Sequence, residues 1–172
     1  MKRALVWLRR DYRLHDNHAL SEALKQADES YLLFNFDPYF LDTLKKTDRR
    51  ITWIIESLMS LNAALSQYNS RVIISYGPPQ EEIPKYLKAL KVEGLFFNRD
   101  YSPYAIARDE EISSACNELA VTVSSYKDHV IFEPEDVSKE DGSPYTVFTP
   151  FKKAWFRCFQ EQGAEVPNYN CD

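Results

Sequence analysis

Glycine is scarce in this sequence, which contains four glycines in 172 residues. Neither GxGxxG nor GxxxxGK[ST] follows the first apolar segment, so the glycine-rich loops that cradle phosphates with main-chain N–H groups are missing. The GxSxG pattern around the nucleophilic serine of α/β-hydrolases is missing as well. These absences argue against mononucleotide binding through backbone amides and against serine-based hydrolysis.

Cysteine and histidine are also few. The three cysteines, Cys116, Cys158 and Cys171, form no CxxC pair, and the three histidines show no HExxH spacing, so no metal site is predicted. Cys116 falls within a helical pattern, where a small buried thiol is the expected structure. The sequence therefore favours free thiols in a reducing compartment and predicts no catalytic residue in this chain.

Long apolar runs are absent too. No segment approaches the roughly 20 residues that span a membrane, and the N-terminus lacks the apolar region and cleavage site of a signal peptide. We therefore expect a cytoplasmic protein without membrane contact. The net charge of -5 argues against a nucleic-acid-binding surface, because phosphate binding needs a basic face. Residues 1–13 are a local exception, where Asp11 is the one acid among five basic side chains.

Five short apolar segments alternate with helical patterns along the first three quarters of the chain. The first four show little polar alternation, which is typical of strands covered on both faces. Strand and helix alternating in this way predict an α/β fold, a doubly wound five-stranded parallel sheet with helices on both faces (Rossmann-like). The predicted strands are 4–8, 31–36, 72–76, 94–98 and 121–126.

Local signals mark where two of the helices begin. Asn17 is placed to cap the helix that follows the first loop. Ser102 and Pro103 predict the start of a helix after the fourth strand, with serine as cap and proline in the first turn. Apolar positions from Ile51 keep helical spacing for about five turns.

After Tyr126 the alternation stops, which sets the expected domain organisation. Residues 1–126 are predicted to form the α/β core, and 127–161 a meander and short helix that complete the same domain. That helix is expected to have Thr149 as its cap and Pro150 at its first position. Residues 162–172 are expected to begin an interdomain linker. In this segment we expect Tyr145 and Phe148 in the core and Trp155 against the sheet.

Polar groups follow three of the predicted strands, at 9–11, 35–37 and 98–101. Ligands of doubly wound sheets lie at the carboxyl ends of strands where the strand order reverses, so these ends would form a pocket. The aromatic content of 14% would supply apolar walls. Ordinary strand-end polarity with ion pairs at the rim, such as Arg10 with Asp37, is an equally good interpretation of spacing alone. The acidic run 109–111 is expected on a solvated helix face.

Three ordered motifs resemble the DNA photolyase and cryptochrome family. They are LVWLRRDYRLHDNHAL, FFNRDYSPYAIARDEEI and DGSPYTVFTPFKKAW, and they extend over residues 5–155. The resemblance implies an N-terminal α/β domain that binds a light-harvesting antenna chromophore. It also implies a larger helical domain, which would hold FAD and damaged DNA and split pyrimidine dimers with blue light. That FAD-binding domain is expected to be absent from this chain, which alone would be inactive.

The resemblance also implies a binding site. In deazaflavin-binding members the antenna lies over the carboxyl ends of the first, second and fourth strands. The arginine there would hold an anionic ring oxygen or carboxylate, the aspartates would accept hydrogen bonds, and the phenylalanine would pack on the ring. The matching positions are Arg10, Phe36, Asp37, Asp100 and Tyr101.

Two further expectations concern neighbouring residues. Folate-antenna members place an Asn-Glu pair where this chain has Tyr104 and Ala105, which favours a deazaflavin or flavin over methenyltetrahydrofolate as the antenna. Asp11 and Arg13 are expected to form a partly buried pair that braces the first loop, with His15 in the same network.

Three functions remain open at this level. The first is the antenna-binding domain of a DNA photolyase, with DNA contacted through the FAD domain. The second is the same domain in a cryptochrome, a light-signalling receptor, and this part of the chain does not separate the two. The third is a stand-alone nucleotide-binding α/β domain, against which the shortage of glycine and the FTPFKKAW segment count.

Overall fold

The computed structural model describes residues 1–163 together with Tyr169 and Cys171. Contacts divide the chain into two compact units. The first consists of Met1–Tyr126 with Tyr169–Asp172, and the second is Lys127–Asn168. Of the linker expected at 162–172, residues 164–168, 170 and 172 lie outside the described residues.

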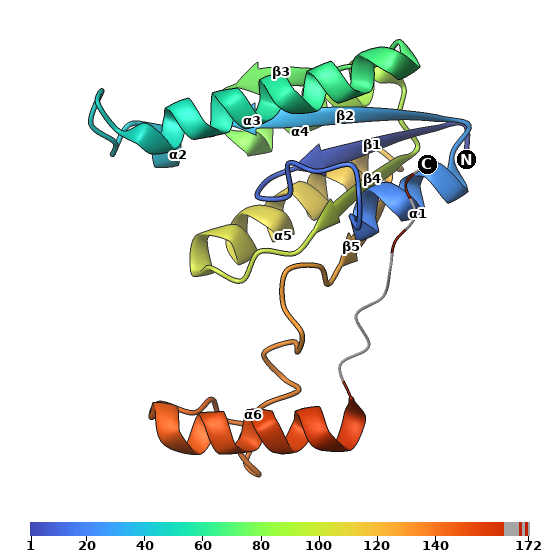
Figure 1. Ribbon diagram of the computed structural model, residues 1–172. Coiled ribbons are helices and arrows are strands. Elements are labelled where there is room, and N and C mark those ends of the chain that lie inside the picture. Colours follow the sequence, from blue (N-terminus) through green and yellow to red (C-terminus); the bar gives the residue numbers. More distant parts are fainter. Residues whose placement is uncertain (164–168, 170, 172) are drawn as a thin grey trace. The chain divides into compact units, whose positions relative to one another are not determined.

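A five-stranded, all-parallel sheet forms the centre of the first unit (Figure 1). The strand order is β3-β2-β1-β4-β5, so the chain builds outward from β1 in one direction and then in the other. This confirms the predicted doubly wound sheet. The strands are β1 (Arg3–Leu8), β2 (Glu29–Phe36), β3 (Val72–Tyr76), β4 (Gly94–Asn98) and β5 (Thr122–Tyr126).

Capping residues set the starts of the helices, as two of the sequence signals predict. The Asn17 side chain accepts a hydrogen bond from the Leu20 N–H, and the Ser102 hydroxyl accepts one from the Ala105 N–H. The helices are α1 (His18–Gln26), α2 (Pro38–Leu41), α3 (Arg49–Leu65), α4 (Pro79–Leu90), α5 (Pro103–Glu118) and α6 (Phe148–Gln162), with a short 3₁₀ turn η1 (Ser66–Tyr68) after α3.

Strand β1 is buried on both faces because its side chains enter two different cores. Val6 and Leu8 belong to a cluster with α1 and α3, whereas Leu5 and Trp7 belong to a second cluster with α4 and α5. All four side chains are at most 3% exposed. Burial of each such side chain stabilises the fold by roughly 1.5–3 kcal/mol, which explains the unbroken apolar run of this strand.

The second unit has little core of its own. Ser143 donates its N–H to the Asp141 carboxylate at the predicted turn. Trp155 packs edge-on against Phe132 within this unit. The expectation that Phe148 lies in a core is wrong, because its side chain is 72% exposed. A segment this short buries too small a share of its surface to enclose all of its aromatic rings.

Two further details of this unit differ from expectation. Helix α6 begins at Phe148, one residue before the expected cap Thr149, and its N-cap position, Val147, makes no side-chain capping bond. The helix is also fifteen residues long rather than short. Tyr145 is half-buried and lies edge-on to Phe151.

The described residues include no helix that is both long enough and apolar enough to cross a bilayer. Cys116, Cys158 and Cys171 form no disulfide among the described residues. Cys116, on the inner face of α5, is fully buried in the core, as predicted. Burial raises the pKa of the Cys116 thiol to about 11.

A candidate ligand pocket at the strand ends

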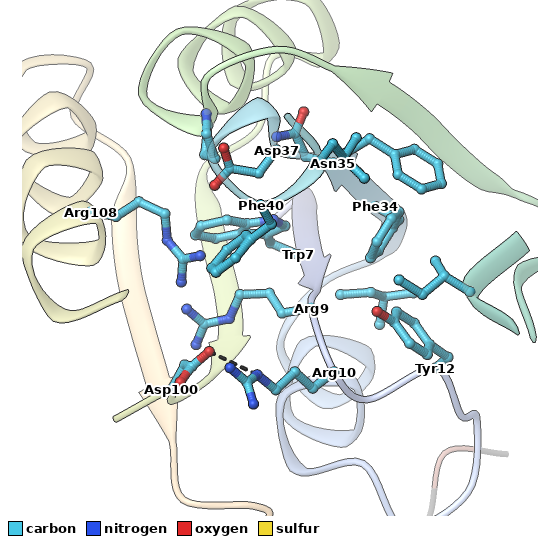
Figure 2. Close-up of a pocket in the computed structure, with 15 residues that line it drawn as sticks. Trp7, Arg9, Arg10, Tyr12, Phe34, Asn35, Asp37, Phe40, Asp100 and Arg108 are labelled. Atoms are coloured by element: carbon cyan, nitrogen blue, oxygen red, sulfur yellow. Dashed lines mark ion pairs between the residues drawn. The ribbon is translucent and has the colours of Figure 1, made fainter. Parts of the chain in front are cut away.

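A cavity of about 200 Å³ lies where the strand order reverses (Figure 2). The connections from β1 and β4 run to opposite sides of the sheet, which leaves the ends of these neighbouring strands uncovered by a crossover. The walls of the cavity come from the ends of β1 and β2, the loop after β1, helix α2, and single residues after β4 and on α3, α4 and α5. This is the position that the strand-end polarity predicted.

Four of the five predicted site residues line this cavity. They are Arg10, Phe36, Asp37 and Asp100, whereas Tyr101 is not among the lining residues. Their roles as ligand contacts remain a prediction.

The rim ion pair differs from the one expected. Arg10 Nε lies 3.0 Å from Asp100 Oδ2, so Arg10 pairs with Asp100 rather than with Asp37. The Arg10 side chain is 63% exposed and that of Asp100 is 11% exposed. Burial alone would raise the pKa of Asp100, but the Ser102 N–H and the Arg10 guanidinium outweigh it and lower that pKa.

Asp37 has a structural role at the start of α2. One carboxylate oxygen accepts from the Tyr39 N–H as the helix cap, and the other accepts from the Tyr104 hydroxyl at 2.5 Å. The Tyr39 and Tyr104 rings stack in parallel with centroids 3.7 Å apart. Burial and then the Asp37 hydrogen bond raise the pKa of Tyr104. Each carboxylate oxygen of Asp37 retains a second lone pair for a ligand.

A buried cluster of Arg9, Arg108 and Asp109 forms another wall and was missed from the sequence. Arg9 donates through Nη1 to both Asp109 oxygens, at 2.6 and 2.8 Å, and through Nη2 to the Asn98 carbonyl. Arg108 donates to the same carboxylate at 2.8 and 3.0 Å. The two arginine side chains are 7% and 5% exposed, and both line the cavity.

The prediction of a solvated acidic face on α5 is therefore wrong for Asp109, whose side chain is 16% exposed. It holds for Glu110 and Glu111, which are exposed. A helical signal for the buried face was present, because Arg108 follows Ala105 by three residues and precedes Ile112 by four.

The two guanidiniums also contact the aromatic ring of Trp7. Arg9 Cζ lies 5.0 Å from the Trp7 ring centroid and 4.7 Å from that of Phe97, and Arg108 Cζ lies 4.8 Å from Trp7. Burial lowers the pKa of Arg9; Asp109 opposes this effect, and Arg108 adds to it. Both arginines remain charged, since a guanidinium does not deprotonate in proteins.

A buried polar brace holds the loop after β1. Asn98 Nδ2 donates to the Asp11 carboxylate at 2.6 Å, and the Arg9 N–H donates to the same group at 2.8 Å. Asp11 thus braces the loop as expected, but through Asn98, because β4 lies directly beside β1. The Arg13 guanidinium donates to the Asp16 carbonyl within the same loop, whereas the His15 side chain is exposed.

The opposite side of the cavity is aromatic. Tyr12 lies edge-on to Phe34, with centroids 5.3 Å apart, and Phe36 lies edge-on to Phe34 at 4.9 Å. Burial, followed by the nearby Asp11 charge, raises the pKa of Tyr12 to about 12. No metal-binding cluster of three His, Cys, Asp or Glu side chains occurs in the described part of the chain. Aromatic rings facing arginines suit a flat conjugated ligand that carries anionic or carbonyl oxygens.

A doubly wound sheet with such a cavity at its switch point defines a small-molecule-binding α/β domain. Comparison with known proteins then identifies the family. The DNA photolyase family model matches residues 4–169, and the chain belongs to this family. The resemblance of the three sequence motifs is thereby confirmed.

Relatives of this chain include photolyases and cryptochromes. The chain is 31% identical over 151 residues to the deoxyribodipyrimidine photo-lyase of a Synechococcus strain, covering 88% of this chain and 31% of that protein. It is 30% identical over 160 residues to the (6-4)DNA photolyase of Arabidopsis thaliana, covering 87% and 29%. The chain thus spans about a third of the length of these relatives.

Solved structures show the same fold. An archaeal photolyase from Sulfolobus tokodaii matches with a TM-score of 0.71 and 28% identity, over 77% of this chain and 31% of that one. A cryptochrome from Synechocystis matches with a TM-score of 0.78 and 22% identity, over 91% and 34%. The second likeness supports the fold alone.

Proposed function

We propose that this chain is the light-harvesting, antenna-chromophore-binding domain of a deoxyribodipyrimidine photolyase. The observation that carries the proposal is the cavity at the strand ends, with aromatic rings on one side and buried arginines on the other, in a chain of the photolyase family. Splitting of pyrimidine dimers with blue light would take place on FAD and DNA in a helical domain. That domain would also be the partner of this chain, which alone would be inactive.

A deazaflavin or flavin suits the donors of this cavity. Arg9 lines the cavity, and its buried Nε has no hydrogen-bond partner among the described residues, so this N–H would serve a ligand oxygen. Arg10 at the rim would hold an anionic or carboxylate group of the ligand. Phe36 would pack on the ring, and Asp37 or Asp100 would accept from ring or hydroxyl donors. A cavity of about 200 Å³ is small for a ligand pocket, so it would take part of the ring system and leave the ligand's side chain outside.

Two observations favour a flavin over a folate. The Sulfolobus tokodaii photolyase contains two FAD molecules, an observation taken to imply a novel light-harvesting cofactor there. In this chain Ala105 is fully buried and has no polar side chain, so that position offers no carboxylate to a pterin. Tyr101, which does not line the cavity, stays a prediction as a contact.

Ligand titration of the purified chain tests the proposal. Riboflavin 5′-phosphate, an 8-hydroxy-5-deazaflavin and methenyltetrahydrofolate would be added separately, and binding followed by absorbance and fluorescence. We expect the flavin or deazaflavin to bind, and Arg10→Ala to bind it about tenfold more weakly because a charge-assisted hydrogen bond is lost. Arg49→Ala removes an exposed charge away from the cavity and should bind as the wild type does.

Several outcomes would overturn this assignment. Tight binding of ATP with no chromophore bound would revive the stand-alone nucleotide-binding domain. Equal binding by the Arg10→Ala and wild-type proteins would remove Arg10 from the site. Preferential binding of methenyltetrahydrofolate would overturn the choice of flavin.

A cryptochrome is the second candidate, because this chain also matches Cryptochrome-2 of Gallus gallus, at 30% identity over 141 residues. A full-length protein that includes the FAD domain would be illuminated with blue light in the presence of a dimer-containing oligonucleotide. Repair of the dimer would support the photolyase, and absence of repair would support the cryptochrome. The cytoplasmic location and the DNA contact through the FAD domain stay predictions.

A further inference from the structure

Trp7 holds an unusual position in the cavity wall. Its ring is 3% exposed, lines the cavity, and has the guanidinium carbons of Arg9 and Arg108 at 5.0 and 4.8 Å from its centroid (Figure 2). The two arginines come from the loop after β1 and from α5. Two cations from distant parts of the chain therefore lie against one indole ring.

An indole beside an excited flavin-type chromophore creates a difficulty for light harvesting. The excited ring is a strong oxidant, so one electron can pass from the indole to it. Trp7 would then carry an indole radical cation, and the bound chromophore would have gained one electron. The electron then returns, both partners regain their ground states, and the excitation is lost as heat. An antenna site with tryptophan in its wall needs a means of suppressing this electron transfer.

We propose that Arg9 and Arg108 keep Trp7 from donating an electron, so that the excited state of the bound chromophore survives long enough to be transferred. The inference rests on the proposed function and assigns the two arginines a role beyond ligand binding. An electron leaving Trp7 would create a positive charge about 5 Å from two existing ones. Such repulsion is strong in a buried site, because little water screens it.

The charge balance of the cluster supports this role. Both guanidiniums share the carboxylate of Asp109, so the three side chains together carry one net positive charge. The contact of the two guanidiniums with Trp7 also favours the neutral ring, since a cation is attracted to the electron-rich face of an indole and repelled by its radical cation. Oxidation of Trp7 is thus disfavoured both by the loss of attraction and by the gain of repulsion.

Time-resolved fluorescence of riboflavin 5′-phosphate bound to the full 172-residue chain tests this inference. Arg108→Met keeps a long side chain and removes the charge, and we expect the bound flavin's lifetime to fall about tenfold as electron transfer is released. Arg108→Lys keeps the charge and should stay within about twofold of the wild type. Arg49→Met is the matched control, because it removes an exposed charge that does not line the cavity, and its lifetime should be unchanged.

A second substitution identifies the electron donor. Trp7→Phe combined with Arg108→Met should restore the wild-type lifetime, because phenylalanine does not reduce an excited flavin. Trp7→Phe alone should leave the lifetime unchanged, so this variant can still refute the proposal if Arg108→Met fails to fold. Transient absorption should show an indole radical in Arg108→Met only.

The failures of the two proposals are distinguishable. If the wild-type chain binds no flavin or deazaflavin, the proposed function fails. If the chain binds flavin and Arg108→Met keeps the wild-type lifetime, the protective role alone is overturned. The same conclusion follows if Trp7→Phe lengthens the wild-type lifetime several-fold, because Trp7 would then already be quenching. If Tyr104→Phe, and not Trp7→Phe, restores the wild-type lifetime in the Arg108→Met protein, the protective role is also refuted.

Discussion

Asp109→Asn would leave Arg9 and Arg108 facing an amide in place of the carboxylate that they share. The substitution keeps the size of the side chain and removes its charge. Two guanidiniums, each less than a tenth exposed, would then repel each other without a counter-charge between them. The cavity wall and the contact between the first loop and α5 both depend on this arrangement.

The loss in the free energy of unfolding can be judged from the burial of the cluster. Removing one partner of a buried ion pair typically costs about 3–5 kcal/mol. Asp109 retains 16% exposure, and the cavity admits water to one side of the arginines, so we expect the lower end, about 3 kcal/mol. That is a large share of the roughly 5–15 kcal/mol by which a domain is stable.

Urea denaturation followed by far-UV circular dichroism and tryptophan fluorescence measures this loss. The midpoint should fall while the slope with urea concentration stays the same. Glu110→Gln is the matched control, because it removes the same charge from the next residue on the exposed side of α5, and it should change the free energy of unfolding by less than about 0.5 kcal/mol. Equal and small effects of both substitutions would refute the account of the buried cluster.

Three further predictions concern other groups of the sheet unit. Asn98→Ala removes the amide donor to Asp11 and should lower the free energy of unfolding by about 1–3 kcal/mol, whereas a change below 0.5 kcal/mol in urea denaturation would contradict the brace. The Cys116 thiol, with a pKa of about 11 and no exposure, should resist alkylation by iodoacetamide at pH 8 until the protein is unfolded, while Cys158 reacts in the native state. Mass spectrometry of the labelled peptides measures both reactions, and labelling of Cys116 in the native protein would contradict its burial. The lowered pKa of Asp100 means that its contribution to stability is present above the unfolded-state pKa of about 4 and is lost as the pH falls through the folded-state value. Asp100→Asn should therefore lose less stability than the wild type between about pH 4 and pH 2, and identical acid profiles would contradict this.

The sheet could be predicted from the sequence because its strands are short, apolar and buried on both faces. Such segments leave a pattern within five or six residues, and the caps Asn17 and Ser102 are equally local. Contacts between distant residues leave no such pattern. Arg9 and Asp109 are 100 positions apart in the chain, so the residues next to each of them in the sequence give no sign that the charge is buried and paired.

The candidate site was predictable in position but not in detail. Strand-end polarity and the family motifs placed Arg10 and Asp100 in the cavity, but the pairing of Arg10 depends on the loop geometry. The role of Asp37 as both a helix cap and the acceptor of the Tyr104 hydroxyl depends on how α2 and α5 approach each other. The exposure of Phe148 shows the same limit, since an apolar residue is buried only where enough chain is present to cover it.

The side-chain amide of Asn98 couples the assembly of the sheet to the formation of the cavity. Its nitrogen donates to Asp11 and to the Asn17 side chain, at 2.6 and 2.8 Å, and its oxygen accepts from the Ala19 N–H at 3.0 Å. These bonds join β4 to residues that lie 79 to 87 positions earlier in the chain. The loop after β1 is therefore held in place by β4, so the pairing of β4 with β1 and the completion of the cavity depend on the same side chain. A folding intermediate without β4 would have no binding site, whereas the finished domain would present a rigid one that loses little entropy when a ligand enters.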